Sequence, residues 1–161
     1  MIQKFYNAQK AQSLLFLVVG SIASILSIYF FIASINTISL GFAIPFFVFG
    51  VAQTILGFKT YIKTNSERQF VMLSAKENTQ QIITIEIPKI NKILTDYNRK
   101  NYIFLGLNVL SIIIFTVFSA FELYKGLGLA LFVQSLIHIS SLYFENNRSQ
   151  IYFKWLNDYY N

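Results

Sequence analysis

From residue 11 to residue 58 the chain carries no aspartate, glutamate, lysine or arginine. A second stretch, residues 102–144, contains only Glu122 and Lys125 as charged residues. Helices that face water need a polar side, and these stretches do not have one. Only 12% of the residues are charged and 55% are hydrophobic, whereas soluble domains carry roughly a quarter charged residues. The long uncharged stretches therefore exclude an ordinary soluble domain and predict an integral membrane protein.

Four segments are long enough to cross a bilayer. A hydrocarbon core about 30 Å thick requires roughly 20 apolar residues in a helix. The segments that meet this requirement are residues 14–33, 38–58, 102–121 and 127–144. Two short links, residues 34–37 and 122–126, join them in pairs, so we expect two helical hairpins. The fold class predicted is an all-α membrane four-helix bundle with helical extensions outside the membrane.

The first segment also invites comparison with a cleaved signal peptide, because Lys4 and Lys10 precede it. Its apolar stretch is too long for a signal peptide, and the large Phe31 stands where a small residue should precede cleavage. We therefore expect residues 14–33 to be retained as a membrane helix.

The distribution of basic residues predicts the orientation. Eight lysines and arginines lie in residues 59–101, whereas the two short links offer only Lys125. Cationic residues resist export, so we expect the N-terminus, residues 59–101 and the C-terminal tail to lie in the cytoplasm. The net charge of +6 thus indicates orientation and not a nucleic-acid partner. Frequent Ile, Lys, Asn, Phe and Tyr are typical of an AT-rich bacterial genome, and the expected location is a bacterial inner (plasma) membrane.

The segment 59–101 is expected to extend the second and third spans as an antiparallel helical pair. Ser66 and Gln69 have the spacing of a capping box, which predicts a new helix start. Pro88 suits the first turn of a further helix. Isoleucines alternate with polar residues over 83–87, so a short strand there is an alternative.

The tail, residues 145–161, is predicted to continue the fourth span as an amphipathic helix. Its apolar stripe, a candidate interfacial surface, consists of Ile151, Tyr152, Trp155, Leu156 and Tyr159. Such a helix either lies on the membrane surface or packs on the other extensions. We favour packing.

Polar residues inside the spans are the candidate site, because uncompensated polarity is costly in lipid. The candidate cluster is Gln53, Asn108, Gln134, His138 and Ser141. At 1.5 Å per residue, Gln53, Asn108 and His138 lie roughly 6–9 Å above the inner boundary. We hypothesise that these three share hydrogen bonds. Helix packing is the simpler interpretation, and an ion, proton or ligand path and contact with a partner helix are the alternatives.

Glu122 is a candidate charge at the outer edge of the membrane, beside Lys125. The simpler interpretation is a solvated pair at the lipid headgroups. A ring of Glu122 carboxylates around an oligomeric pore is the alternative.

The sequence offers little for catalysis. The chain has no cysteine and one histidine, so we expect no metal site and no haem or other cofactor. The two aspartates, Asp96 and Asp158, both lie outside the spans, which argues against a membrane aspartic protease. Serines near His138 allow an acyl-transfer pair in principle, but no Gly-rich nucleophile turn accompanies them. We expect no enzymatic activity.

Two stretches of the chain are distinctive together: residues 45–61 (PFFVFGVAQTILGFKTY) and 126–156 (GLGLALFVQSLIHISSLYFENNRSQIYFKWL). They resemble a group of uncharacterised bacterial four-transmembrane-helix inner-membrane proteins. The matching positions are Gly126, Gly128, Gln134, Glu145, Arg148 and Tyr152. The chain departs from the pattern at residues 141–144, where an acidic residue is expected. Some of these proteins look like the membrane partners encoded beside secreted antibacterial toxins, so the resemblance implies an immunity role.

We therefore expect a non-catalytic membrane protein that acts through protein–protein interaction. An accessory subunit and an immunity protein against a membrane-acting toxin both fit. The expected partners are the lipid bilayer and either another protein or a second copy of the chain. The alternative is a small oligomeric channel or transporter that uses its polar interior.

Overall fold

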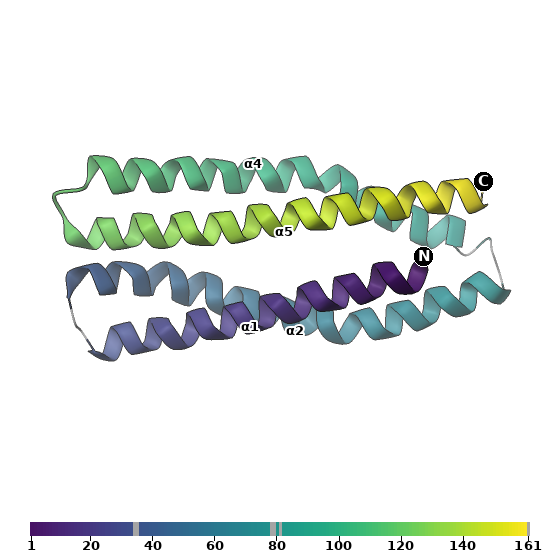
Figure 1. Ribbon diagram of the computed structural model, residues 1–161, viewed down its shortest axis with the longest axis horizontal. Helices are drawn as coiled ribbons and strands as arrows, with labels where there is room; N and C mark the ends of the chain where they lie inside the picture. Colours follow the sequence, from purple (N-terminus) through teal and green to yellow (C-terminus); the bar gives the residue numbers. More distant parts are fainter. Residues whose placement is uncertain (34–35, 78–79, 81, 161) are drawn as a thin grey trace.

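The computed structural model describes residues 1–33, 36–77, 80 and 82–160, and these residues are almost entirely helical. The elements are α1 (Ile2–Ala33), α2 (Thr37–Glu77), η1 (Ile82–Glu86), α4 (Ile87–Val117) and α5 (Glu122–Tyr160). Helices α1 and α2 form one hairpin, α4 and α5 form a second, and α2 packs against α5 between them (Figure 1). The prediction of an all-α four-helix bundle is therefore confirmed for the described part of the chain.

The four long helices among the described residues are each long and apolar enough to cross a membrane. Many of their apolar side chains point away from the bundle: Ile25 is 66% exposed, Ile103 is 62% exposed and Val117 is 68% exposed. Apolar surface on this scale is unfavourable in water and favourable in lipid. By length and composition, the chain is a membrane protein with four candidate spans.

The link between α4 and α5 lies earlier than the sequence indicated. We placed it at residues 122–126, but α4 ends at Val117 and α5 begins at Glu122. The predicted third span therefore ends too late. The link itself is apolar, so hydropathy alone does not separate it from the span, whereas a carboxylate at Glu122 suits the first turn of a helix. The other predicted link, residues 34–37, lies partly outside the described residues.

Two local predictions for the segment 59–101 are wrong. Helix α2 runs without a break from Thr37 to Glu77, so no helix starts at Ser66. A capping box satisfies the free N–H groups of a helix start, and inside a continuous helix those groups already bond to carbonyls one turn earlier. Residues 82–86 form a single π-helical turn instead of a strand. Pro88 lies in the first turn of α4, as predicted.

Glycines allow the helices to approach closely. They lie at each of the major helix contacts: Gly20, Gly50 and Gly57 between α1 and α2, Gly41 and Gly126 between α2 and α5, and Gly128 between α4 and α5. A Cβ atom added at Gly126 would overlap the backbone carbonyl of Ile38. Membrane helices associate through such small residues, because close backbone approach replaces the hydrophobic effect that lipid cannot supply.

The main apolar core lies at one end of the bundle, where both termini are found (Figure 1). We call this the terminal end. Its buried side chains are Phe5, Tyr6, Val71, Ile82, Ile90, Tyr152 and Leu156. They come from every element, so the tail of α5 packs on the ends of the other helices. Burial of large apolar side chains from water favours such a core.

A polar network, which we call the terminal clamp, joins α1, α2, η1 and α4 beside this core. The Tyr6 hydroxyl donates to Glu86 Oε1 at 2.7 Å, and Lys89 Nζ donates to Tyr6 Oη at 3.1 Å and to Glu67 Oε2 at 3.0 Å. Burial and the adjacent Glu86 carboxylate raise the pKa of Tyr6, so its hydroxyl stays a donor at neutral pH. Burial opposes ionisation of Glu67, but hydrogen bonds from Lys63 and Lys89 outweigh it and lower the pKa of Glu67.

Candidate functional site

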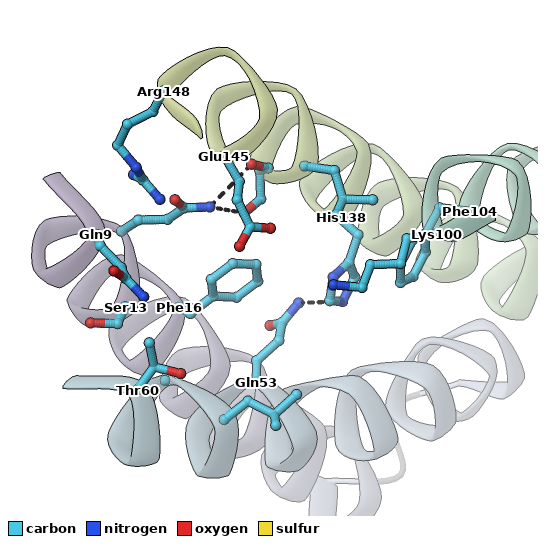
Figure 2. Close-up of a pocket in the computed structure, with 15 residues that line it drawn as sticks. Gln9, Ser13, Phe16, Gln53, Thr60, Lys100, Phe104, His138, Glu145 and Arg148 are labelled. Carbon is cyan, nitrogen blue, oxygen red and sulfur yellow. Dashed lines mark hydrogen bonds between the residues drawn. The ribbon is translucent and has the colours of Figure 1, made fainter. Parts of the chain in front are cut away.

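A cavity of about 360 Å³ opens among the four long helices of the described chain (Figure 2). Its lining includes Gln9 and Arg148, so it extends towards the terminal end. Each helix contributes to its lining, with Gln12 from α1, Gln53 from α2, Lys100 from α4 and His138 from α5. Helices α1 and α4 do not pack along one another in the described residues, so the cavity occupies the space between them. Its volume lies in the range of about 300–1,000 Å³ that is usual for small-ligand pockets.

Gln53 is the centre of the polar lining. Its side chain is almost completely buried, and its amide nitrogen donates to Gln134 Oε1 at 2.9 Å and lies 3.2 Å from His138 Nε2. An amide NH₂ group can only donate, so His138 Nε2 acts as the acceptor in this contact. Both protons of the amide are thus used, and the ring of His138 is fixed further by stacking on Phe104, with 4.4 Å between ring centroids.

Ser141 lies on the opposite side of the pocket and pairs with α1. The amide nitrogen of Gln12 donates to the hydroxyl and to the backbone carbonyl of Ser141. Sequence reasoning missed Gln12, because it precedes the first predicted span, at residue 14. The signal was present in the spacing: Gln9, Gln12 and Ser13 recur at three and four residues and therefore share one face of a helix.

Several buried polar atoms around the pocket have no hydrogen-bond partner among the described residues. They are the side-chain oxygens of Gln9, Gln12 and Gln53 and the Nε atom of Arg148. An unsatisfied buried polar group costs about 1–3 kcal/mol, so native proteins pair such groups with protein, water or ligand. Four of them around one cavity indicate a place where a polar molecule binds.

Charged side chains of both signs lie at the rim. Lys100, Glu145 and Arg148 line the cavity, and Figure 2 shows the Glu145 carboxylate directed into it from α5. The Arg148 guanidinium lies over the Phe5 ring, with 5.4 Å to the ring centroid. Burial lowers the pKa of Arg148, and the nearby Glu145 carboxylate opposes this shift.

No family model, curated protein or solved structure matches this chain at a significant level. The site must therefore be interpreted from its own geometry. Among the described residues, no group of three or more histidine, aspartate and glutamate side chains is close enough to hold a metal ion.

Asn108 does not join Gln53 and His138. Its amide nitrogen donates to Ser135 Oγ at 2.8 Å, on the face where α4 packs against α5. Counting residues from the predicted membrane boundary placed Asn108 at the same depth as Gln53. Such a count does not show which way a helix is rotated about its axis. Helix α4 packs mainly on α5, and the Asn108 side chain bonds to Ser135 of that helix instead of Gln53.

The remaining candidate residues lie away from the pocket. Glu122 is exposed at the start of α5, and no ion pair joins it to Lys125 in the described part of the chain. In the tail, Tyr152 is buried, whereas Ile151 and Tyr159 are exposed. Along α5 the ring of Trp155 stacks on the ring of Tyr152 and on the ring of Tyr159.

Proposed function

We propose that this chain is a non-catalytic membrane protein that acts by binding, and that its pocket takes a small polar ligand. The observation that carries the proposal is the Gln53 side chain. It is almost fully buried, both amide protons are committed to other side chains, and its oxygen is left without a partner at the pocket. A ligand that donates a hydrogen bond would satisfy this oxygen.

The contacts of His138 and Ser141 support binding over chemistry. His138 is bonded to the Gln53 amide, and Ser141 is bonded to the Gln12 amide. A serine nucleophile requires a base that accepts its proton directly, and an amide cannot do so. The polar side chains are thus arranged as hydrogen-bonding groups around a cavity.

The packing of the opposite half of the bundle favours a pocket that ends inside the bundle over a channel through one chain. Between Gln53 and the links, α1 meets α2 at Gly20 and Gly50, and α2 meets α5 at Gly41 and Gly126. Backbones in such close contact leave no room for a hydrated path between these pairs of helices. This packing favours a pore between copies of the chain over one within a single chain.

A second candidate is the interaction with another protein that the sequence predicts, as an accessory subunit or as the immunity protein that the resemblance implies. The observation that favours it is the position of α4. This helix packs mainly on α5, and its candidate span is the least buried of the four in the described chain. An outer helix of this kind is free to contact a partner within the membrane. Repeated isolation of the chain without a partner from native membranes would count against this candidate.

We further propose that both termini face the cytoplasm of a bacterial cell. The termini and the α2–η1 region lie at the same end of the bundle (Figure 1). Most lysines and arginines also lie there, which favours retention of this end on the cytoplasmic side.

Occupancy of the pocket tests the binding function. Thr60 lines the cavity (Figure 2), so Thr60→Trp should fill it, whereas Thr116 is exposed on α4 and Thr116→Trp serves as the matched control. Native mass spectrometry of protein purified in mild detergent should show a bound small molecule on the wild type and on the control, and much less on Thr60→Trp. A wild type without any bound molecule, or equal occupancy in all three proteins, would contradict the proposal.

A further inference from the structure

The geometry points to a zwitterionic ligand in this pocket, the phosphoethanolamine headgroup of an aminophospholipid. This inference rests on the proposed binding function and adds the chemical class of the ligand. It follows from three observations: the unpaired acceptors, the charges of both signs, and the position of the cavity at the edge of the candidate spans.

The acceptors match a primary ammonium group. Gln9, Gln12, Gln53 and Glu145 line the cavity, and the side-chain oxygens of the three glutamines are buried without a partner among the described residues. A primary ammonium has three N–H donors and no acceptor, so it satisfies several of these oxygens at once. Figure 2 also places the Phe16 ring between Gln53 and Glu145, where an aromatic face would attract a cation.

The cations match a phosphate group. Lys100 extends into the pocket beside His138 (Figure 2), and in the described residues it forms no ion pair. Arg148 brings a second positive charge and an unpaired Nε–H donor. Guanidinium and ammonium groups are the side chains that bind phosphate oxygens.

A pocket that has both unpaired acceptors and positive charges fits a zwitterion better than a simple ion. A simple anion would lie against Glu145 and leave three amide oxygens without donors. A simple cation would meet the positive charges of Lys100 and Arg148. A ligand with an ammonium and a phosphate a few bonds apart satisfies both groups together.

The position of the cavity favours a lipid as the source of this headgroup. Lys100 and Glu145 adjoin the ends of the predicted third and fourth spans, at the depth of lipid headgroups. Helices α1 and α4 do not pack along one another beside the cavity, and Leu15 and Ile103 are exposed on these two helices. Acyl chains can therefore remain in the bilayer while the headgroup enters between the helices.

The headgroup itself provides the decisive comparison. Full-length wild type, delipidated in detergent, is placed in phosphatidylcholine nanodiscs with or without equal additions of phosphatidylethanolamine or phosphatidylglycerol, and the bound lipid and the melting temperature are measured. We expect phosphatidylethanolamine to be enriched on the protein by about tenfold or more over phosphatidylcholine, which corresponds to about 1.4 kcal/mol. The trimethylammonium group of phosphatidylcholine donates no hydrogen bond. Equal retention of the two, or strongest retention of phosphatidylglycerol, would overturn the inference.

Two variants locate the bound headgroup. Glu145→Gln removes the carboxylate and Lys100→Met removes a cation from the pocket, so each should reduce the enrichment of phosphatidylethanolamine severalfold. Lys92→Met removes an exposed lysine from the same helix as Lys100. This control variant should leave the enrichment of phosphatidylethanolamine unchanged. If a pocket variant does not fold, the comparison of headgroups on the wild type still decides the question. Enrichment that survives both pocket variants would overturn the inference.

Soluble phosphoethanolamine separates a lipid from a free metabolite. If the soluble compound raises the melting temperature as much as the lipid does at equal concentration, the lipid source is wrong. Weak stabilisation by the soluble compound and strong stabilisation by the lipid support it. If the pocket retains another small molecule and ignores phosphatidylethanolamine, this inference fails while the binding function stands. A pocket that retains nothing contradicts both.

Discussion

Two buried polar side chains, Gln53 and Glu86, are satisfied in different ways. The acceptor oxygen of Gln53 has no partner in the described residues and lies at a cavity. The Glu86 carboxylate accepts from the Tyr6 hydroxyl at 2.7 Å and lies 3.7 Å from Lys89 Nζ. The first arrangement suits a ligand, whereas the second holds elements of the protein together. Burial alone does not distinguish a binding site from a structural contact; the partners do.

The terminal clamp predicts the effect of removing one hydroxyl. Tyr6→Phe keeps the buried ring but takes from Glu86 its closest donor, and such a loss costs about 1–3 kcal/mol. We expect a lower free energy of unfolding and a lower melting temperature in detergent, measured by circular dichroism. Tyr102→Phe removes a hydroxyl from a side chain that is 73% exposed and is the matched control. Equal melting temperatures for the two variants would contradict this role of the clamp.

Only part of the candidate site could be predicted from the sequence. Gln53, Gln134, His138 and Ser141 were recognised because polar residues stand out in apolar helices. Gln12 was missed because it lies outside the predicted span, where a glutamine is ordinary. Asn108 was grouped with Gln53 because depth along a helix can be counted from the sequence. The rotation of one helix against another is set by packing, which the sequence does not show directly.

At the scale of elements, the contacts between helices depend on glycines placed where backbones touch. Gly126 of α5 meets Ile38 of α2, and Gly41 of α2 meets α5 in return. Gly106 differs from these glycines, because a Cβ added there would meet nothing within 4 Å. The same residue type thus serves as a packing device at one position and faces open space at another.

Gly126→Leu should therefore separate the two hairpins. Its side chain would overlap the backbone of α2, and overpacking of this kind costs about 1–3 kcal/mol or more. We expect a lower melting temperature and a reduced yield of folded protein by size-exclusion chromatography in detergent. Gly106→Leu, the control, should match or exceed the wild type, because leucine favours a helix more than glycine does. Tolerance of Gly126→Leu would show that α2 and α5 do not approach in this way.

The elements themselves were predictable to different degrees. The long apolar segments predicted four helices correctly, because a single apolar segment of about 20 residues can satisfy its own backbone hydrogen bonds in lipid only as a helix. The ends of the helices were harder to predict. Residues 118–121 are mostly apolar and were included in the predicted third span, although they form the link before α5. Residues 82–86 alternate like a strand but form a π-helical turn, in which Ile82 and Glu86 are buried at the terminal end and Ile85 is exposed. Tertiary contacts decided this segment.

At the scale of the whole molecule, one chain combines two kinds of packing. Within the candidate spans, apolar side chains face outward and the helices meet through small residues. At the terminal end, large apolar side chains such as Tyr6, Ile90 and Leu156 are completely buried. The candidate pocket lies where these two regions meet. The proposed lipid ligand requires that the charged and amide groups of this pocket lie at the headgroup level of a bilayer, on the side where both termini are found.

Site-directed labelling tests the arrangement across the membrane most directly. The chain has no cysteine, so Glu122→Cys and Lys92→Cys each introduce a single reactive thiol at an exposed position. With a membrane-impermeant maleimide, position 122 should react in intact cells, and position 92 should react only after the membrane is opened. Reaction of both positions from the same side, or of position 92 alone in intact cells, would contradict the account.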